Sequence, residues 1–95
     1  MKVIINGKDI KSEHDFHKQI AEALDFPKYY GSNLDALWDV LSTDIERPIT
    51  LIWKDAKYSR VELDSSYEKI IKILQRVEEQ DINFGFEDQF KLVLE

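Results

Sequence analysis

Short apolar runs alternate with longer amphipathic stretches along this chain, a pattern that predicts strands alternating with helices. Residues 3–5, 49–53 and 90–94 form the apolar runs, and Asn6-Gly7 closes the first of them. We expect the first run to be a buried strand and the second to be a central strand covered on both faces. This alternation favours an α/β domain with a small parallel sheet and helical crossovers.

Apolar residues at helical spacing predict two longer helices. Ser12 and Asp15 have the spacing of a capping box for a helix that ends near Leu24. Its apolar face contains Phe16, Ile20, Ala23 and Leu24. We expect Ser65 or Ser66 to cap a further helix. The apolar face of that helix contains Tyr67, Ile70, Ile71, Leu74 and Val77.

Two stretches leave alternatives open. Residues 55–63 fit either a short helix or an irregular connector. Residues 82–86 could extend the last strand, pair with it or form a loop.

Residues 29–41 are typical of an aromatic loop that opens a short helix. Ser32 and Asp35 have the spacing of a second capping box, which would place Asp35 in the first turn, where the helix dipole favours a carboxylate. Trp38 lies at the edge of the apolar stripe, and core packing is the favoured interpretation for this residue alone. The stripe itself contains Leu34, Leu37 and Leu41.

Asp35 and Asp39 are four residues apart and therefore share one helical face. Like charges at this spacing destabilise an isolated helix by about 0.2–0.5 kcal/mol. Residues 29–46 contain no Lys or Arg that would neutralise them. Because Asp39 lies beyond the first turn, the helix dipole gives it no compensation. A patch that works against its own helix is more readily explained by a binding partner than by the fold.

Composition narrows the class of protein. The chain has 95 residues, 43% of them hydrophobic, which suits one domain over residues 1–95 with one core. Its net charge of −6 argues against direct binding of nucleic acid and favours a basic partner. There is no cysteine, no signal-peptide pattern and no apolar stretch of membrane-spanning length. We expect a cytoplasmic domain, not bound to a membrane and monomeric when free.

Candidate chemistry points to binding more than to catalysis. His14 and His17 are too few ligands for a zinc site, so we expect no metal and no cofactor. Asp35 and Asp39 could act as paired acid–base carboxylates, but so short a chain has little room for the desolvating pocket that tunes such groups. We therefore expect no enzyme activity. Binding requires less: Tyr29, Tyr30 and Trp38 supply rigid apolar area, and Gly31 allows a close approach or a positive φ.

Residues 29–31 and 33–39, which read YYG and NLDALWD, resemble the most recognisable segment of the barstar family, the intracellular inhibitors of barnase-type ribonucleases. Weaker similarity extends over nearly the whole chain. The resemblance implies a three-stranded parallel sheet packed with about four helices. It also implies a cis bond between Arg47 and Pro48.

The same resemblance implies that the loop and the short helix block the active site of a basic, extracellular-type ribonuclease or toxin nuclease. Asp39 would be the central carboxylate among the enzyme's phosphate-binding cations, and Asp35 would flank it. Tyr29 would stack at the rim of the enzyme's active site. The matching contact positions are Tyr29, Gly31, Asn33, Leu34, Asp35, Trp38 and Asp39. We add Tyr30 to the expected contact positions because its aromatic ring supplies rigid apolar area.

The chain departs from the family pattern at the second contact patch. Ile73, Arg76 and Gln80 share one helical face there, and Arg76 places a cation where an acid would meet a basic enzyme. Asp44 stands where the family has an aromatic residue. These differences favour a target related to barnase but distinct from it. The alternative is a protein-interaction module that binds a basic regulatory partner through the same patch.

Overall fold

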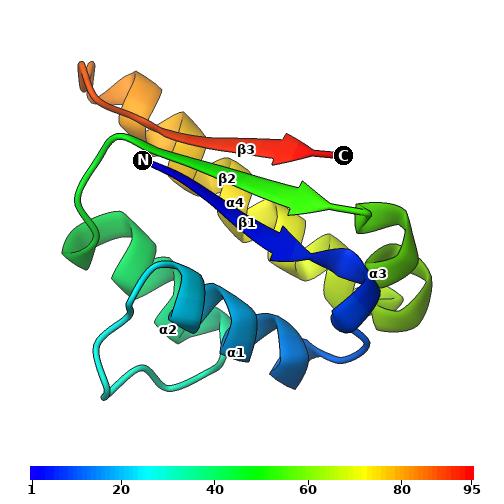
Figure 1. Cartoon of the computed structure of the whole chain (residues 1–95). Coiled ribbons are helices and arrows are strands. Elements are labelled where there is room, and N and C mark those ends of the chain that lie inside the picture. Colours follow the sequence, from blue (N-terminus) through cyan, green and yellow to red (C-terminus); the bar gives the residue numbers. More distant parts are fainter.

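The computed structural model describes all 95 residues and shows an α/β arrangement of three strands and four α-helices (Figure 1). The strands are β1 (Lys2–Asn6), β2 (Ile49–Lys54) and β3 (Phe90–Leu94). The α-helices are α1 (Glu13–Ala23), α2 (Leu34–Asp39), α3 (Ala56–Leu63) and α4 (Ser65–Asn83). A 3-10 turn, η1 (Gly7–Asp9), follows β1, and a π-helical segment, η2 (Val40–Asp44), continues α2.

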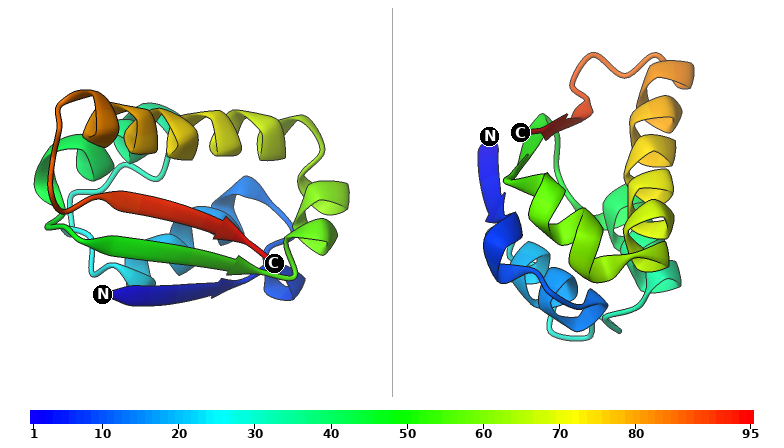
Figure 2. Two further views of the ribbon diagram at one scale, coloured as in Figure 1. Left: turned by 90° about the horizontal axis from the view of Figure 1, so that it is seen from above. Right: turned by 90° about the vertical axis from the view of Figure 1, so that its right-hand side faces the viewer.

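The sheet is parallel throughout, with β2 between β1 and β3, as the alternating pattern predicted. The helices pack against one face and along one side of the sheet, and the other face carries no helix (Figure 2). In β2, Leu51 is buried toward the helices, while Ile52 is only half-buried on the open face. The prediction that β2 is covered on both faces is therefore wrong.

The open face also corrects the prediction for the first strand. Ile4, Ile52 and Val93 are neighbours in register across the sheet. Ile4 is 61% exposed because β1 is an edge strand with helices on one side only, so the apolar run at residues 3–5 is buried at Ile5 but not at Ile4. A short apolar run does not reveal by itself whether one face or both will be covered.

Helix boundaries agree with the predicted pattern in α1 and differ in α4. Ser12 accepts a hydrogen bond from the Asp15 backbone N–H and so caps α1, while the Asp15 carboxylate accepts from the Lys11 N–H. In α4, the cap position is Asp64, and its side chain makes no capping hydrogen bond; the prediction that Ser65 or Ser66 caps this helix is wrong. The predicted apolar face of α4 is buried in full.

The two open stretches are now defined. Residues 55–63 contain the helix α3, and residues 82–86 comprise the end of α4 and a loop. The bond between Arg47 and Pro48 is cis, as the resemblance implied. None of the helices combines the length and the apolar character needed to span a membrane.

Candidate functional site

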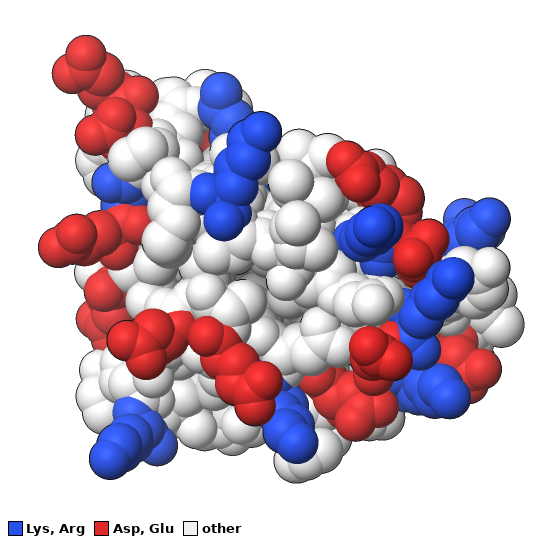
Figure 3. All heavy atoms as spheres, in the orientation of Figure 1, with Lys and Arg blue, Asp and Glu red and all other residues white.

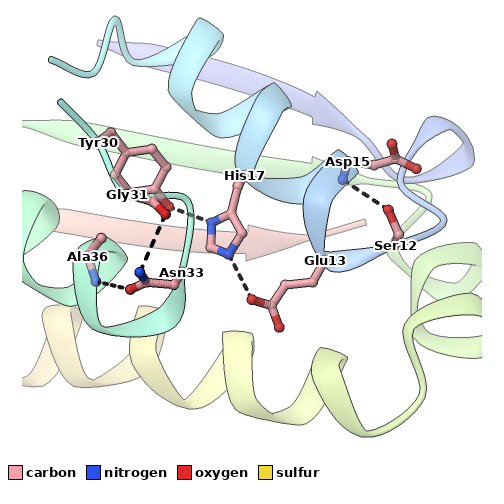
Figure 4. Close-up of polar contacts among 8 residues, drawn as sticks. All are labelled: Ser12, Glu13, Asp15, His17, Tyr30, Gly31, Asn33 and Ala36. Atoms are coloured by element: carbon pink, nitrogen blue, oxygen red, sulfur yellow. Dashed lines mark hydrogen bonds and ion pairs between the residues drawn. The ribbon is translucent and has the colours of Figure 1, made fainter. Parts of the chain in front are cut away.

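The aromatic loop is attached to α2 by Asn33. The Asn33 side-chain oxygen accepts a hydrogen bond from the Ala36 backbone N–H at 2.8 Å, and its amide nitrogen donates to the Gly31 carbonyl (Figure 4). Ser32 has a left-handed φ of 53° and lies outside the helix. The predicted cap at Ser32 is therefore wrong, and Asn33 caps α2. Asn33 thus shapes the site from within, and its contact with a partner stays a prediction.

Tyr30 anchors the same loop to α1. Its hydroxyl lies against Nδ1 of the buried His17, whose Nε2 is 3.0 Å from the Glu13 carboxylate (Figure 4). Burial, with the nearby charge of Glu13, raises the pKa of Tyr30, so the phenol stays protonated. Nδ1 of His17 shares one hydrogen bond with the phenol, and Nε2 shares the other with Glu13. The geometry gives Tyr30 a structural role, and its predicted contact with a partner is untested.

From the sequence, His17 was considered only together with His14, as a possible pair of metal ligands. Its role depends on Tyr30, thirteen residues away, which no local pattern relates to α1. His14 is exposed and takes no part in this network.

Tyr29 points the other way and is 75% exposed. Its hydroxyl donates a hydrogen bond to the Asp44 carboxylate at 2.8 Å. This hydrogen bond first, then the negative charge of Asp44, raises the pKa of Tyr29. Asp44, at a position where the resemblance implies an aromatic residue, therefore positions an aromatic side chain of the loop. Sequence reasoning missed this pair because its members are fifteen residues apart.

Asp35 and Asp39 are both exposed, and neither carboxylate has a hydrogen-bond or ion-pair partner in the protein. Asp35 lies in the first turn of α2, as predicted, where the dipole stabilises it. Asp39 lies in the interior of the continuous helical run 34–44, beyond the reach of the dipole at either end, so the dipole gives its carboxylate no stabilisation. The helix continues directly into the π-helical segment η2, a type of irregularity that is frequent at functional sites.

Trp38 and Arg76 join α2 to α4. The Arg76 guanidinium lies 4.1 Å from the centroid of the Trp38 ring, a cation–π geometry. Trp38 is half-buried and packs against the core. Ile73, one turn before Arg76 on α4, does the same. The structure therefore brings the two predicted contact patches together along the contact of α2 with α4.

A hollow of about 290 Å³ lies between the aromatic loop and the end of α2. Its lining residues are Tyr29, Tyr30, Gly31, Ala36, Asp39, Val40 and Asp44. Gly31 does not have a positive φ, so that part of the prediction is wrong. A Cβ at Gly31 would lie 3.3 Å from the Asn33 side-chain nitrogen, which is a close contact. Glycine at this position therefore leaves room for the Asn33 side chain. In Figure 3, acidic side chains also gather at the left edge, over η2 and the turn toward β2.

Exposed carboxylates beside an exposed aromatic side chain, on a small α/β domain, are typical of a protein that binds a basic protein partner. Comparison with known proteins agrees. Residues 1–95 match the family model described as Barstar (barnase inhibitor). A curated relative from Bacillus subtilis (strain 168), named "Putative ribonuclease inhibitor YrdF", is 36% identical over 94 residues, which cover 99% of this chain and 98% of the relative.

The chain therefore belongs to the barstar family. Members of this family are inhibitors and not enzymes, in agreement with the absence of catalysis expected above. The fold agrees as well, since the family resemblance implied three parallel strands with about four helices. Membership supports a role as a ribonuclease inhibitor.

Proposed function

We propose that this protein inhibits a basic ribonuclease of the barnase type or a related toxin nuclease by placing the surface of Tyr29, Asp35 and Asp39 in the enzyme's active site. It would act in the cytoplasm as a monomer. The observation that carries the proposal is the pair of exposed carboxylates on α2 without a protein partner, beside an exposed aromatic ring.

The physical basis is charge mimicry. An active site that cleaves phosphodiesters holds cations arranged for phosphate oxygens. Two carboxylates on one rigid helical face present negative charge in the same way, and the surrounding acidic field accelerates encounter with a basic enzyme. Asn33 and Tyr30 hold the loop and α2 in place, which reduces the conformational entropy lost on binding.

Asp39→Ala tests the proposal against a barnase-type ribonuclease. We expect Kd to rise by about thirty-fold or more, because removing a central anchor of an interface costs about 2 kcal/mol or more. The thermal midpoint should stay the same or rise, since the Asp39 carboxylate has no partner in the protein and is repelled by the like charge of Asp35 one turn away. Kd is measured by calorimetry and inhibition by RNA cleavage.

Asp88→Ala is the matched control. Asp88 is an exposed aspartate in the loop before β3, so the substitution removes the same charge away from the proposed surface. If Asp39→Ala leaves inhibition intact, or weakens it no more than Asp88→Ala does, the proposed surface is wrong. If the protein binds a basic partner through Asp39 but inhibits no nuclease, the interaction-module alternative is correct.

A further inference from the structure

A second hollow, of about 460 Å³, lies away from the aromatic loop, where η1 and α3 meet at the carboxyl ends of β1 and β2 (Figure 1). Its lining residues are Gly7, Lys8, Lys11, Lys57, Tyr58, Arg60, Val61 and Glu62. The volume is within the range of small-molecule sites.

The hollow concentrates positive charge in an acidic protein. Four of the chain's 13 basic side chains line it, with Glu62 as the one acidic side chain. None of the four forms an ion pair, because the ion pair that a Lys or Arg side chain makes in this structure joins Arg47 to Asp81. Figure 3 shows Lys and Arg side chains at the right, over α3 and its surroundings, with Asp and Glu side chains between them. Like charges held together destabilise the fold slightly, so the cluster is better explained by an anion.

Tyr58 brings two of these cations together from different elements. Lys8 Nζ from η1 lies 5.4 Å from the Tyr58 ring centroid, and Lys57 Nζ from α3 lies 5.5 Å from it. Both distances are within the range of cation–π attraction. The close packing beneath fixes the two elements: a Cβ at Gly7 would come within 2.2 Å of the Asp55 carbonyl oxygen. The Ser59 hydroxyl also donates to the Gly7 carbonyl at 2.8 Å.

We propose that this hollow binds a small polyphosphate anion, of the size of a nucleoside diphosphate, through Lys8, Lys11, Lys57 and Arg60. Lysine and arginine are the side chains that bind phosphate. A small ligand is favoured over a nucleic acid because the field of the cluster extends only about 8 Å at physiological salt. A long polyanion would also meet the acidic remainder of the chain, whose net charge is −6.

The test is a titration of the ¹⁵N-labelled full chain, followed by amide chemical shifts. ADP and pyrophosphate are added separately, and adenosine serves as the ligand without phosphate. We expect saturable shifts at Gly7, Lys8, Tyr58 and Val61 with one or both phosphate ligands and none with adenosine. Shifts with ADP that exceed those with pyrophosphate assign the site to nucleotides, and equal shifts assign it to the polyphosphate group alone.

Lys57→Glu should raise the Kd of the phosphate ligand by at least about tenfold, since a hydrogen bond to a charged group contributes about 1.5–3 kcal/mol. Lys91→Glu makes the same charge change at the opposite end of the sheet and should leave Kd within about twofold, because salt screens charges at this distance. Lys57→Gln repeats the test if Lys57→Glu does not fold. Thermal stability of Lys57→Gln should not fall.

Three results would overturn the proposal. The first is the absence of saturable shifts with both ADP and pyrophosphate. The second is an unchanged Kd in the Lys57 variants. The third is tighter binding of a short single-stranded oligoribonucleotide through the same amides, which would identify the hollow as a nucleic-acid site.

Discussion

The contact between Arg76 and Trp38 shows what single side chains contribute to the candidate surface. Trp38 buries part of its ring against the core and offers the rest to the guanidinium of Arg76. Helical spacing predicted that Arg76 lies on one face with Ile73. It could not predict the stack, because Trp38 and Arg76 are 38 positions apart in sequence and meet only through the packing of α2 against α4. The cation is therefore fixed beside the acidic face of α2.

Arg76→Glu measures what this fixed cation does in an interface. Against a barnase-type ribonuclease we expect Kd to fall by about tenfold, because a positive charge that faces a basic enzyme is replaced by a negative one. The thermal midpoint should fall slightly, since an exposed cation–π contact contributes about 0.5–1 kcal/mol. Lys69→Glu, the same charge change on an exposed residue of α4, reports the general electrostatic effect. If both variants bind equally, Arg76 acts only through general electrostatics and makes no local contact with the enzyme.

At the scale of elements, α4 protects the free edge of the sheet. The backbone N–H groups of Phe90 and Leu92, both on the edge strand β3, donate to the carboxylates of Asp81 and Glu78, each at 2.7 Å. An edge strand with unpaired donors invites pairing with another chain, and these carboxylates occupy that position. The sequence identified β3 and the apolar face of α4. It could not assign Glu78, because acidic residues next to an apolar face are normally solvated.

Glu78→Ala tests this protection. The substitution leaves the Leu92 N–H without its acceptor, so we expect a loss of about 1–3 kcal/mol in the free energy of unfolding. Hydrogen exchange at the Leu92 amide should become faster, and urea denaturation gives the loss of stability. Glu79→Ala is the control, since Glu79 is exposed and its carboxylate has no partner. Equal effects in the two variants would show that Glu78 acts only through charge.

At the scale of the whole molecule, the parallel sheet and its order of elements followed from the alternating apolar pattern. The one-sided coverage did not follow, because the outer row of Ile4, Ile52 and Val93 is as apolar as a buried row. The candidate site was predictable in its exposed part, Asp35 and Asp39, because their like charges repel each other on one helical face. Its supports, His17 beneath Tyr30 and Asp44 beside Tyr29, depend on tertiary contacts that no spacing reveals.

The ion pair of Arg47 with Asp81 joins α4 to β3 and to the loop before β2. Asp81, on α4, is fully buried and accepts from Arg47 Nε at 2.9 Å, from a second guanidinium nitrogen at 3.1 Å, and from the first residue of β3. Burial by itself raises the pKa of this carboxyl. The hydrogen bonds and charge of Arg47, with the Phe90 N–H, outweigh burial, and the pKa lies below its ordinary value of 3.8.

This lowered pKa predicts how stability depends on pH. The unfolded chain binds a proton at Asp81 more readily than the folded protein does, so the stabilisation is complete above about pH 4 and is lost as pH falls through the folded pKa. Asp81→Asn should therefore lower the free energy of unfolding at pH 7 by about 3–5 kcal/mol, because Arg47 keeps a buried charge without its partner. The free energy of unfolding of the variant should also decline less steeply below about pH 4 than that of the unmodified protein. Urea denaturation from pH 7 to pH 3 measures both effects, with Asp88→Asn as the exposed control. If the free energy of unfolding of Asp81→Asn falls between pH 7 and pH 3 as steeply as that of the unmodified protein, Asp81 is not the source of the pH dependence.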